Sequence, residues 1–400
     1  MRGSGKSTTG KDVATNLGWS FLDLDDVFTT EKGETIREFI AKGNSWEDFR
    51  KIELEILKKV VTQNPTNTVV SCGGGIIETP ESREFLQKYQ GPVIHLSREI
   101  DSIVDYLSAD KTRPSLGLEP RELWNKREPL YHTSSNYEFF SSKENEKSEA
   151  ETHSRCIKFV RSVLFPKKLK MPSESFFLSL TFGDLSPVAQ LIPHLVQDVN
   201  AVELRVDLLD NLSPNFIKKQ IQILRDYAQD LPIIYTVRSK EQGGKFAGDE
   251  NAMLGLLEIG LKANCEFIDV EAKWVGEGLS RRILEKKRLT QIIASEHDFV
   301  NAPTAENLQK LFNSCLKVNH ADVIKVVGFA KDLKDVFTLQ QVLSTIQTPL
   351  PIIALLAGEK GRLSRVINKF MTPVTNPLLP VAAAPGQLSV RQILKMRENI

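Results

Sequence analysis

The sequence is poor in several features that would place a protein in a specialised class. Its four cysteines lie far apart without a CxxC pair, and its six histidines form no HExxH motif. This pattern excludes a zinc knuckle or dithiol motif, and a disulfide framework is unusual in a chain of this size. No apolar run approaches the ~18–20 residues of a membrane span, and the opening MRGSGKSTTG is not typical of a signal or transit peptide. We therefore expect a cytoplasmic protein without a structural metal.

An excess of charge of one sign is also lacking. Lys and Arg total 52 against 51 for Asp and Glu, a net charge of +1, so the chain lacks the basic excess of general nucleic-acid binders. Neither nucleic acid nor a membrane is expected as a partner. Because single cores stop growing at roughly 250–300 residues, the length of 400 residues predicts two or three domains.

A charged segment marks the predicted domain boundary. Residues 141–172 read SSKENEKSEAETHSRCIKFVRSVLFPKKLKMP, and the first half is charged with almost no apolar periodicity, as in linkers. The apolar spacing in the second half predicts a short helix. We therefore predict a first domain at 1–140, a linker at 141–172 and a second domain at 173–400.

The two predicted domains have different strand and helix patterns. In the first, apolar runs such as FLDLD and TVVSCGGGI alternate with helical stretches such as SWEDFRKIELEILKKVV, which indicates an α/β domain with a mostly parallel sheet. In the second, strand-like runs each followed by a helical segment lie at 176–182, 201–207, 231–238, 266–272, 289–297, 321–330, 351–358 and 379–387. Eight such units predict a closed (β/α)8 TIM barrel. An open doubly wound sheet is the alternative.

The N-terminus carries most of a phosphate-binding P-loop. The candidate residues are Gly3, Gly5, Lys6, Ser7 and Thr8. The glycines let backbone N–H groups curl around phosphate, the lysine reaches the β- and γ-phosphates, and the serine ligates Mg²⁺. A Gly/Ser-rich tail is the alternative. Because the first glycine of the pattern and the strand before it would precede Met1, we expect a domain cut from a longer polypeptide, with poor kinase activity.

Further motifs follow the loop in a fixed order: FLDLD at 21–25, FR at 49–50, GGG at 73–75, RP at 113–114 and REPLY at 127–131. In this order and spacing, residues 1–140 resemble shikimate kinase, a small P-loop kinase that uses ATP and Mg²⁺. The resemblance implies that Asp25 binds the substrate hydroxyls and acts as the base, and that Asp23 lies in the outer coordination sphere of Mg²⁺. It also implies a mobile lid with Arg113 and substrate contacts from Arg50, Arg127, Gly73, Gly74 and Gly75.

Phosphoryl-transfer chemistry supports these roles, because it requires mainly positioning and charge neutralisation. A carboxylate substrate also suits bidentate guanidinium groups. Each residue alone has a simpler explanation: the aspartates could be turn formers at a strand end, GGG could be a plain turn, and Arg50 could face solvent. Their joint occurrence favours the kinase.

The second domain carries polar residues near the ends of its predicted strands, where the chemistry of a barrel lies. They are Glu203, Arg205, Arg238, His297, Lys325, Arg365 and Gln387. Lys325 lies inside the apolar run ADVIKVVGFA, where burial would lower its pKa and make it an amine nucleophile toward a carbonyl. The alternative is a lysine at the polar end of the strand that extends to water.

The motifs VELRVD, TVRSKEQGG, ASEHD, VIKVVG, GRLSRVIN and AAAPGQLS together resemble type I 3-dehydroquinate dehydratase, over nearly all of residues 173–400. The resemblance implies a Schiff base between Lys325 and the substrate ketone, without a cofactor. It implies that His297 removes a proton from the adjacent carbon and then helps to expel the hydroxyl. Arg365 would pair with the substrate carboxylate, and the other strand-end residues would bind ring hydroxyls and hold the charges of the site. A homodimer is expected, as in many barrels of this family.

Some positions depart from those of relatives. Bacterial relatives carry Glu where Gln242 stands, and fungal relatives usually carry a second histidine where Glu296 stands. A carboxylate at position 296 could alter the pKa of His297, although consecutive strand residues point to opposite faces. Neither change removes a catalytic group.

The order of the two domains is similar to that in the fungal pentafunctional AROM family, which implies two activities of chorismate and aromatic amino acid biosynthesis in one chain. Fungal quinate-pathway repressors, which resemble the C-terminal domains of that family, are the alternative from a different class. A repressor predicts damaged catalytic positions, whereas those named above are present. A generic P-loop NTPase fused to an aldolase-type barrel is a third interpretation, but it explains neither GGG nor the ordered arginines.

Overall fold

The computed structural model describes residues 3–109, 119–142, 148–167, 169–274, 287 and 289–398. Arg113, the predicted lid residue, lies outside the described residues. The chain divides into two compact units, Met1–Lys167 and Lys168–Ile400. Both units are α/β, as the sequence predicts. None of the helices in the described ranges has the length and apolarity needed to cross a membrane.

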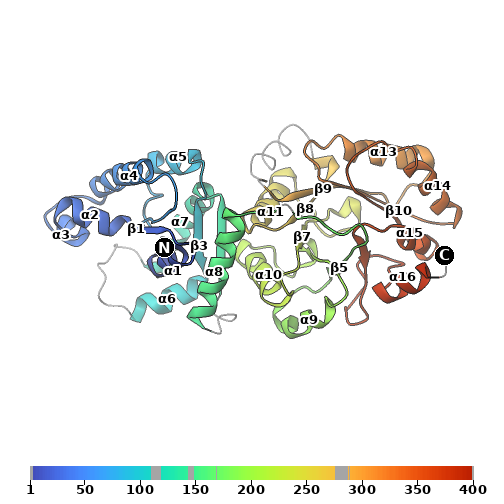
Figure 1. The fold of residues 1–400 in the computed structure, drawn as a ribbon, viewed down its shortest axis with the longest axis horizontal. Coiled ribbons are helices and arrows are strands. Elements are labelled where there is room, and N and C mark those ends of the chain that lie inside the picture. Colours follow the sequence, from blue (N-terminus) through green and yellow to red (C-terminus); the bar gives the residue numbers. More distant parts are fainter. Residues whose placement is uncertain are drawn as a thin grey trace. The chain divides into compact units, whose positions relative to one another are not determined.

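The first unit contains two pairs of parallel strands. β1 (Ser20–Asp23) pairs with β2 (Thr68–Ser71), and β3 (Ile94–Arg98) pairs with β4 (Tyr137–Ser141). The helices that surround them in Figure 1 are α1 (Lys6–Leu17), α2 (Leu24–Lys32), α3 (Ile36–Ala41), α4 (Trp46–Gln63), α5 (Pro80–Lys88), α6 (Ile100–Ala109), α7 (Pro120–Ser134) and α8 (Glu149–Leu164). The predicted parallel pairing is confirmed.

Helix α4 shows how the sequence builds the core of this unit. The Ser45 hydroxyl accepts from the backbone N–H of Asp48, and the Asp48 carboxylate accepts from the backbone N–H of Ser45. This capping box fixes the first turn of the helix. Apolar residues then recur at helical spacing and are buried against the rings of Phe28 and Phe39. The helix predicted from SWEDFRKIELEILKKVV is therefore confirmed.

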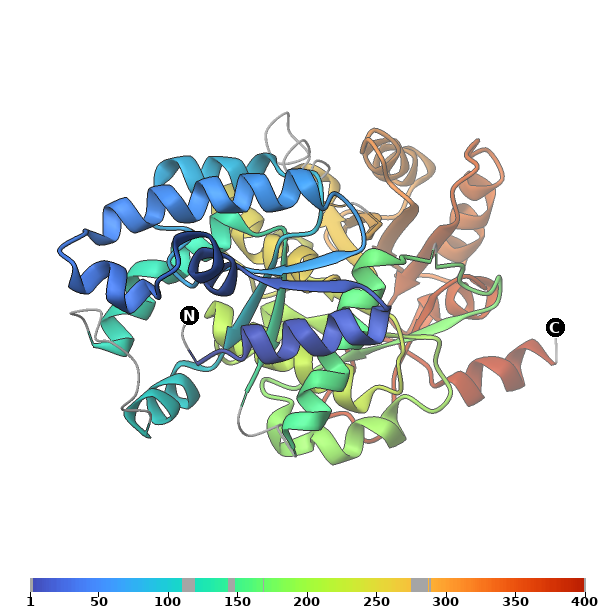
Figure 2. The same cartoon turned by 60° about the vertical axis from the view of Figure 1, so that its left-hand side comes forward.

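Helix α8 occupies much of the segment predicted as a linker. It spans 16 residues, and it packs along α1 and against β4, as Figure 2 shows. Cys156 and Val160 of α8 form a small buried cluster with Val13 of α1. The apolar positions of this helix therefore contribute to the core of the first unit.

The second unit is built on eight parallel strands: β5 (Phe176–Leu180), β6 (Ala201–Arg205), β7 (Ile233–Thr236), β8 (Phe267–Glu271), β9 (Gln291–His297), β10 (Val323–Phe329), β11 (Ile352–Ala357) and β12 (Thr372–Val374). The strands from β5 to β11 pair in chain order, and β5 also pairs with β12. The first strand therefore lies beside the last, as in a sheet that is curled into a barrel. This confirms the predicted (β/α)8 fold over an open doubly wound sheet.

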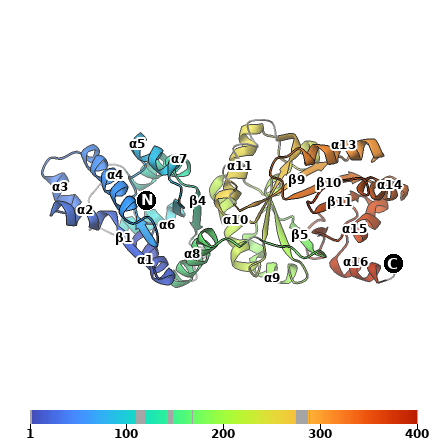
Figure 3. The same ribbon diagram turned by 45° about the horizontal axis from the view of Figure 1, so that its top comes forward.

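Helices lie around this sheet (Figure 3). They are α9 (Ile192–Leu195), α10 (Pro214–Tyr227), α11 (Glu250–Lys262), α13 (Ala305–Leu316), α14 (Lys334–Leu343), α15 (Arg362–Ile367) and α16 (Val390–Arg397), with 3₁₀ turns η2 (Ser186–Leu191), η3 (Val206–Leu208), η4 (Lys240–Gln242), η5 (Ala272–Trp274) and η6 (Glu359–Gly361). One face of the strands packs on these helices, and the other fills the interior, because side chains alternate along a strand. Phe267, Ile293 and Val323 belong to one buried apolar cluster on the inward face.

The predicted strand at 379–387 is wrong. The structure places β12 at Thr372–Val374, and the described residues 379–387 form no strand. The run LPVAAAPGQ contains two prolines, which have no N–H for a ladder. Asn368 supports the actual strand, because its side chain accepts from the backbone N–H of Ala354 in β11 and donates to Thr372 Oγ1 in β12. One side chain thus bridges the strands at the two ends of the sheet.

Candidate active sites

A buried lysine lies inside the barrel sheet. Lys325 follows Val323 on the inward face of β10, and only 5% of it is exposed. Its Nζ lies 2.8 Å from Asp269 Oδ2 in β8 and 3.7 Å from Glu203 Oε1 in β6. The same atom lies 5.5 Å from the ring centre of Phe177 in β5. Two carboxylates and an aromatic ring therefore hold this nitrogen away from bulk water.

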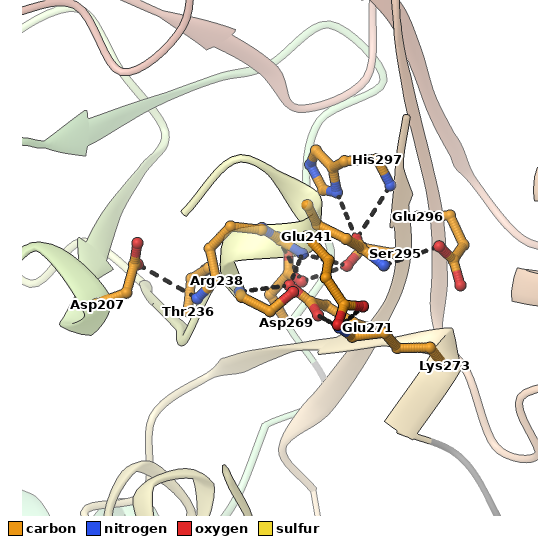
Figure 4. Close-up of polar contacts among 12 residues, drawn as sticks. Asp207, Thr236, Arg238, Glu241, Asp269, Glu271, Lys273, Ser295, Glu296 and His297 are labelled. Atoms are coloured by element: carbon orange, nitrogen blue, oxygen red, sulfur yellow. Dashed lines mark hydrogen bonds and ion pairs between the residues drawn. The ribbon is translucent and has the colours of Figure 1, made fainter. Parts of the chain in front are cut away.

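Asp269 connects the lysine to a wider charge network (Figure 4). Its Oδ1 lies 2.8 Å from Arg238 Nη2 and accepts from Ser295 Oγ at 2.5 Å. Arg238 Nη1 donates to Ser295 Oγ at 2.9 Å and lies 3.2 Å from Glu271 Oε1. Although burial alone would raise the pKa of Asp269, the charges of Arg238 and Lys325 hold it below its ordinary value. Asp269 is therefore an anion that orients two cations.

His297 ends β9 beside this network. Burial, followed by the charges of Arg238 and Lys325, holds the pKa of His297 well below its ordinary value, so the ring is neutral at pH 7. Its Nδ1 lies 3.1 Å from Gln242 Oε1 in η4. Because a neutral imidazole has one donor and one acceptor nitrogen, a proton on Nδ1 leaves Nε2 as a base.

Glu203 and Arg205 lie on the inward face of β6, and neighbouring side chains hold both. Glu203 accepts from Thr236 Oγ1 at 2.7 Å and also from Ser179 Oγ. Arg205 donates from Nε to Asp207 Oδ1 at 2.9 Å and from Nη2 to Asp207 Oδ2 at 2.8 Å. The strand-end residues that the structure brings together are Glu203, Arg205, Arg238, His297 and Lys325.

Sequence reasoning missed four members of this network: Asp207, Asp269, Glu271 and Ser295. Each of them lies two positions from another polar residue in a mostly apolar run, as Asp269 and Glu271 do in EFIDVEA. This spacing places both carboxylates of that run on one face of the strand. Because Asp and Glu are seldom buried without a partner, such a pair predicts a buried ionic network.

Arg365 and Gln387 lie outside this network. Arg365, on α15, is 1% exposed, and its Nη1 donates to Pro373 O at 3.4 Å. Its Nε and Nη2 are buried without a hydrogen-bond partner among the described residues. Burial lowers the pKa of Arg365 to about 10, so it remains a cation at neutral pH. Gln387 stays within its own loop, where Oε1 accepts from the backbone N–H of Ala383 at 3.0 Å.

The second candidate site lies in the first unit, where the GSGKST turn enters α1. Gly3 and Gly5 have positive φ angles of 77° and 79°, a conformation that favours glycine. Ser7 donates from Oγ to Asp23 Oδ2 at 2.6 Å. Asp23 also caps α2, because its Oδ1 accepts from the backbone N–H of Asp25 at 3.1 Å. The end of β1 and the start of α1 thus present adjacent oxygens, the ligand type that Mg²⁺ prefers.

Two buried arginines in this unit meet at Glu78. Arg50 Nε of α4 lies 2.9 Å from Glu78 Oε2, and Arg127 Nη2 of α7 lies 2.7 Å from Glu78 Oε1. Arg50 Nη1 also lies 2.7 Å from Glu53 Oε2. Although burial alone would raise the pKa of Glu78, its bonds with Arg127 and Arg50 lower it. The Glu78 carboxylate therefore forms ion pairs with both guanidinium groups.

The GGG turn packs directly on these arginines. A Cβ on Gly75 would lie 1.7 Å from Arg50 Nη2, and a Cβ on Gly73 would lie 2.3 Å from the carboxylate that pairs with this arginine. The Gly74 carbonyl accepts from the hydroxyl of Tyr131 in α7. Any side chain on the outer two glycines would displace the arginine cluster.

The two sites define two classes of enzyme domain: a barrel with a buried lysine beside a neutral histidine, and a phosphate-loop domain with paired arginines. Residues 176–400 match the family model for type I 3-dehydroquinase, and residues 2–161 match the model for shikimate kinase. The chain belongs to the type I 3-dehydroquinase family and carries a shikimate kinase domain before the barrel.

Relatives share this order of domains. The chain is 40% identical over 410 residues to a pentafunctional AROM polypeptide of Eremothecium gossypii, and 39% identical over 410 residues to one of Kluyveromyces lactis. Each match covers 100% of this chain and 26% of the relative, so the chain spans about a quarter of their length.

Solved structures resemble the barrel. The dehydroquinate dehydratase and shikimate dehydrogenase from S. pombe AroM is 34% identical with a TM-score of 0.52, and the match covers 57% of this chain and 44% of that one. A type I 3-dehydroquinate dehydratase from Clostridium difficile is 22% identical with a TM-score of 0.51, and the match covers 57% of this chain and 94% of that one. The second comparison supports the fold alone.

Proposed function

We propose that the second unit converts 3-dehydroquinate to 3-dehydroshikimate through an imine on Lys325, and that the first unit phosphorylates shikimate with ATP. The observation that carries the dehydratase is the buried Lys325 Nζ, 2.8 Å from Asp269 and in one network with a neutral His297. Lysine becomes a nucleophile toward ketones in such water-poor sites.

The dehydration proceeds in steps that these residues supply. The Lys325 ammonium first gives up one proton, and its free amine then attacks the substrate ketone. That proton and a second one from the nitrogen leave with the carbonyl oxygen as water, so that a protonated C=N bond forms at Nζ. The positive nitrogen acidifies the adjacent carbon, and His297 takes its proton. The electron pair then expels the hydroxyl from the next carbon, and His297 returns the proton so that water leaves. Hydrolysis of the imine releases the product and restores the amine.

The position of Asp269 stabilises the positive charge at Nζ during these reaction steps. Nζ carries a positive charge as the resting ammonium and again as the protonated imine. The carboxylate at 2.8 Å therefore keeps its ion pair from the resting state to the intermediate. Arg238 holds the same carboxylate from its other oxygen, so Asp269 requires no reorganisation during the reaction.

The dehydratase function is tested by incubating the chain with 3-dehydroquinate. We expect enone absorbance to develop, and borohydride added during turnover should leave a reduced adduct on Lys325 that peptide mass spectrometry locates. If the chain binds the substrate but gives neither absorbance nor adduct, it is a metabolite sensor of the repressor type and the proposed catalysis is wrong.

Replacing Arg365 with methionine should weaken the interaction with the substrate carboxylate without lowering the thermal stability of the protein. Nε and Nη2 of Arg365, which have no hydrogen-bond partner among the described residues, suit the substrate carboxylate. A buried charged contact is worth about 2–5 kcal/mol, so kcat/KM should fall about 30-fold or more. The thermal midpoint should not fall, because the change removes a buried cation and keeps an apolar stem. Arg362→Met is the matched control, because Arg362 is exposed and pairs with Glu359 on the surface. Equal losses in both variants would contradict the assignment.

For the first unit, we propose roles for the residues around the P-loop. Lys6 and Thr8 lie in the first turn of α1, and a helix N-terminus attracts phosphate. Ser7 would ligate Mg²⁺, which neutralises phosphate charge when it is bound. Asp23, whose Oδ2 is 2.6 Å from Ser7 Oγ, would lie in the outer coordination sphere of the metal. Asp25 follows as the candidate base for the shikimate hydroxyl, as the family resemblance implies.

Replacing Glu78 with glutamine should tighten the binding of shikimate. Arg50 and Arg127, the arginines proposed to clamp the substrate carboxylate, are both occupied by Glu78. Removing this competing charge should raise the affinity about 10-fold, the equivalent of about 1.4 kcal/mol. Calorimetric titration measures the change, with Glu84→Gln as control because Glu84 forms an ion pair with the exposed Lys88 in α5. Unchanged or weaker binding by the Glu78 variant would show that the substrate does not displace this carboxylate.

We also propose a homodimer in the cytoplasm. The family resemblance supports the dimer. All four cysteines are free thiols, which supports a reducing compartment.

A further inference from the structure

Glu296 precedes His297 in β9, and the two side chains point to opposite faces of the strand. Gln242 of η4 nevertheless joins them. Its Nε2 donates to Glu296 Oε2 at 2.8 Å, whereas its Oε1 accepts from the backbone N–H of His297 at 3.0 Å and lies 3.1 Å from His297 Nδ1. Figure 4 shows Glu296 and His297 with their hydrogen bonds. One amide therefore contacts both residues.

The two ends of this amide are not interchangeable. An amide nitrogen only donates, an amide oxygen only accepts, and an ionised carboxylate only accepts. Glu296 therefore holds the nitrogen of Gln242, which turns the oxygen toward His297. With an acceptor facing it, Nδ1 must carry the imidazole proton, and Nε2 is left as the basic nitrogen.

We propose that Glu296 is a positioning residue, which acts through Gln242 to fix the His297 tautomer that has its proton on Nδ1. This inference rests on the proposed dehydratase function, in which His297 is the base. The same logic applies where a carboxylate fixes the tautomer of a catalytic histidine directly. Here an amide lies between the two groups, because they extend from opposite faces of one strand.

Other charged groups face the two residues from several elements. Arg238, Lys325, Asp269 and Arg205 surround His297. Glu271, Arg238 and Lys273 lie around Glu296, and Ser314 of α13 donates to Glu296 Oε1 at 3.3 Å. The Ser314 contact allows a purely structural role for Glu296, as a link between β9 and α13. The experiment must therefore separate this link from the amide contact.

The test compares Glu296→Gln with Ser314→Ala and with the double exchange Gln242→Glu plus Glu296→Gln. We expect Glu296→Gln to lower kcat about 10- to 100-fold with little change in KM. Ser314→Ala, which breaks only the link to α13, should keep the original rate. The double exchange places a carboxylate directly at Nδ1, so it should recover most of the lost kcat.

Nitrogen NMR of the imidazole provides a readout independent of turnover. His297 should show a protonated Nδ1 in the original chain and a mixture of tautomers in Glu296→Gln. An unchanged kcat and tautomer in that variant would overturn the proposal, as would an equal loss of kcat in Ser314→Ala. If the original chain forms no borohydride-trapped adduct, the dehydratase function itself is wrong, and the tautomer measurement still decides the role of Glu296.

Discussion

Replacing Lys325 with methionine should lower the rate of 3-dehydroquinate dehydration by at least about 10⁴-fold, because the variant has no amine to form the imine. Without a positive nitrogen on the substrate, the adjacent C–H stays weakly acidic, and His297 alone cannot remove its proton at a useful rate. The borohydride adduct should disappear together with the activity. Enone absorbance and mass spectrometry measure the two losses.

The Lys325 variant should still fold, because Asp269 keeps its ion pair with Arg238 at 2.8 Å and methionine keeps the apolar stem of the lysine. Lys331→Ala is the control, since Lys331 is exposed near the end of the same strand. It should retain both activity and adduct. A Lys325 variant that kept more than about a hundredth of the activity would be incompatible with imine catalysis, because loss of a nucleophile is far more costly.

The sequence predicted the architecture well where apolar runs were long. Seven of the eight barrel strands lie within the predicted ranges, since each lies in a mostly apolar run of the sequence. The eighth was misplaced because Thr372–Val374 is only three residues long. So short a strand carries no recognisable period, whereas the longer run at 379–387 looks apolar and strand-like. Tertiary pairing with β5, not local pattern, defines that strand.

The candidate sites were predictable as lone residues but not as networks. Lys325 stood out because a charged residue interrupts an apolar strand. Its partner Asp269, 56 positions away, could be paired with it only once the barrel placed β8 and β10 on either side of β9. Glu78 was missed because it follows the GGG turn without a motif of its own. Its function depends on two arginines from helices that are distant in sequence.

Replacing His297 with alanine should stop the reaction at a different step. We expect kcat to fall about 10²- to 10⁴-fold, the usual contribution of a general acid–base group. The borohydride adduct should persist, because Lys325 can still form the imine with the substrate ketone. Loss of the adduct in this variant would instead mean that His297 is required for imine formation.

The pH profile of kcat/KM should show the effect of the environment of His297 on its pKa. Because burial and the neighbouring cations hold its pKa below the ordinary value, the basic form exists above that lowered pKa and is lost only as pH falls through it. The acid limb that His297 contributes to kcat/KM in the original chain should therefore lie below the ordinary histidine value of about 6.5, and it should be missing from the residual activity of His297→Ala. His194→Ala, at an exposed histidine, should leave the profile unchanged. Because kcat/KM reports groups of the free enzyme, a limb from His297 above that value would mean that its pKa is not lowered in the free chain and would contradict a neutral resting imidazole.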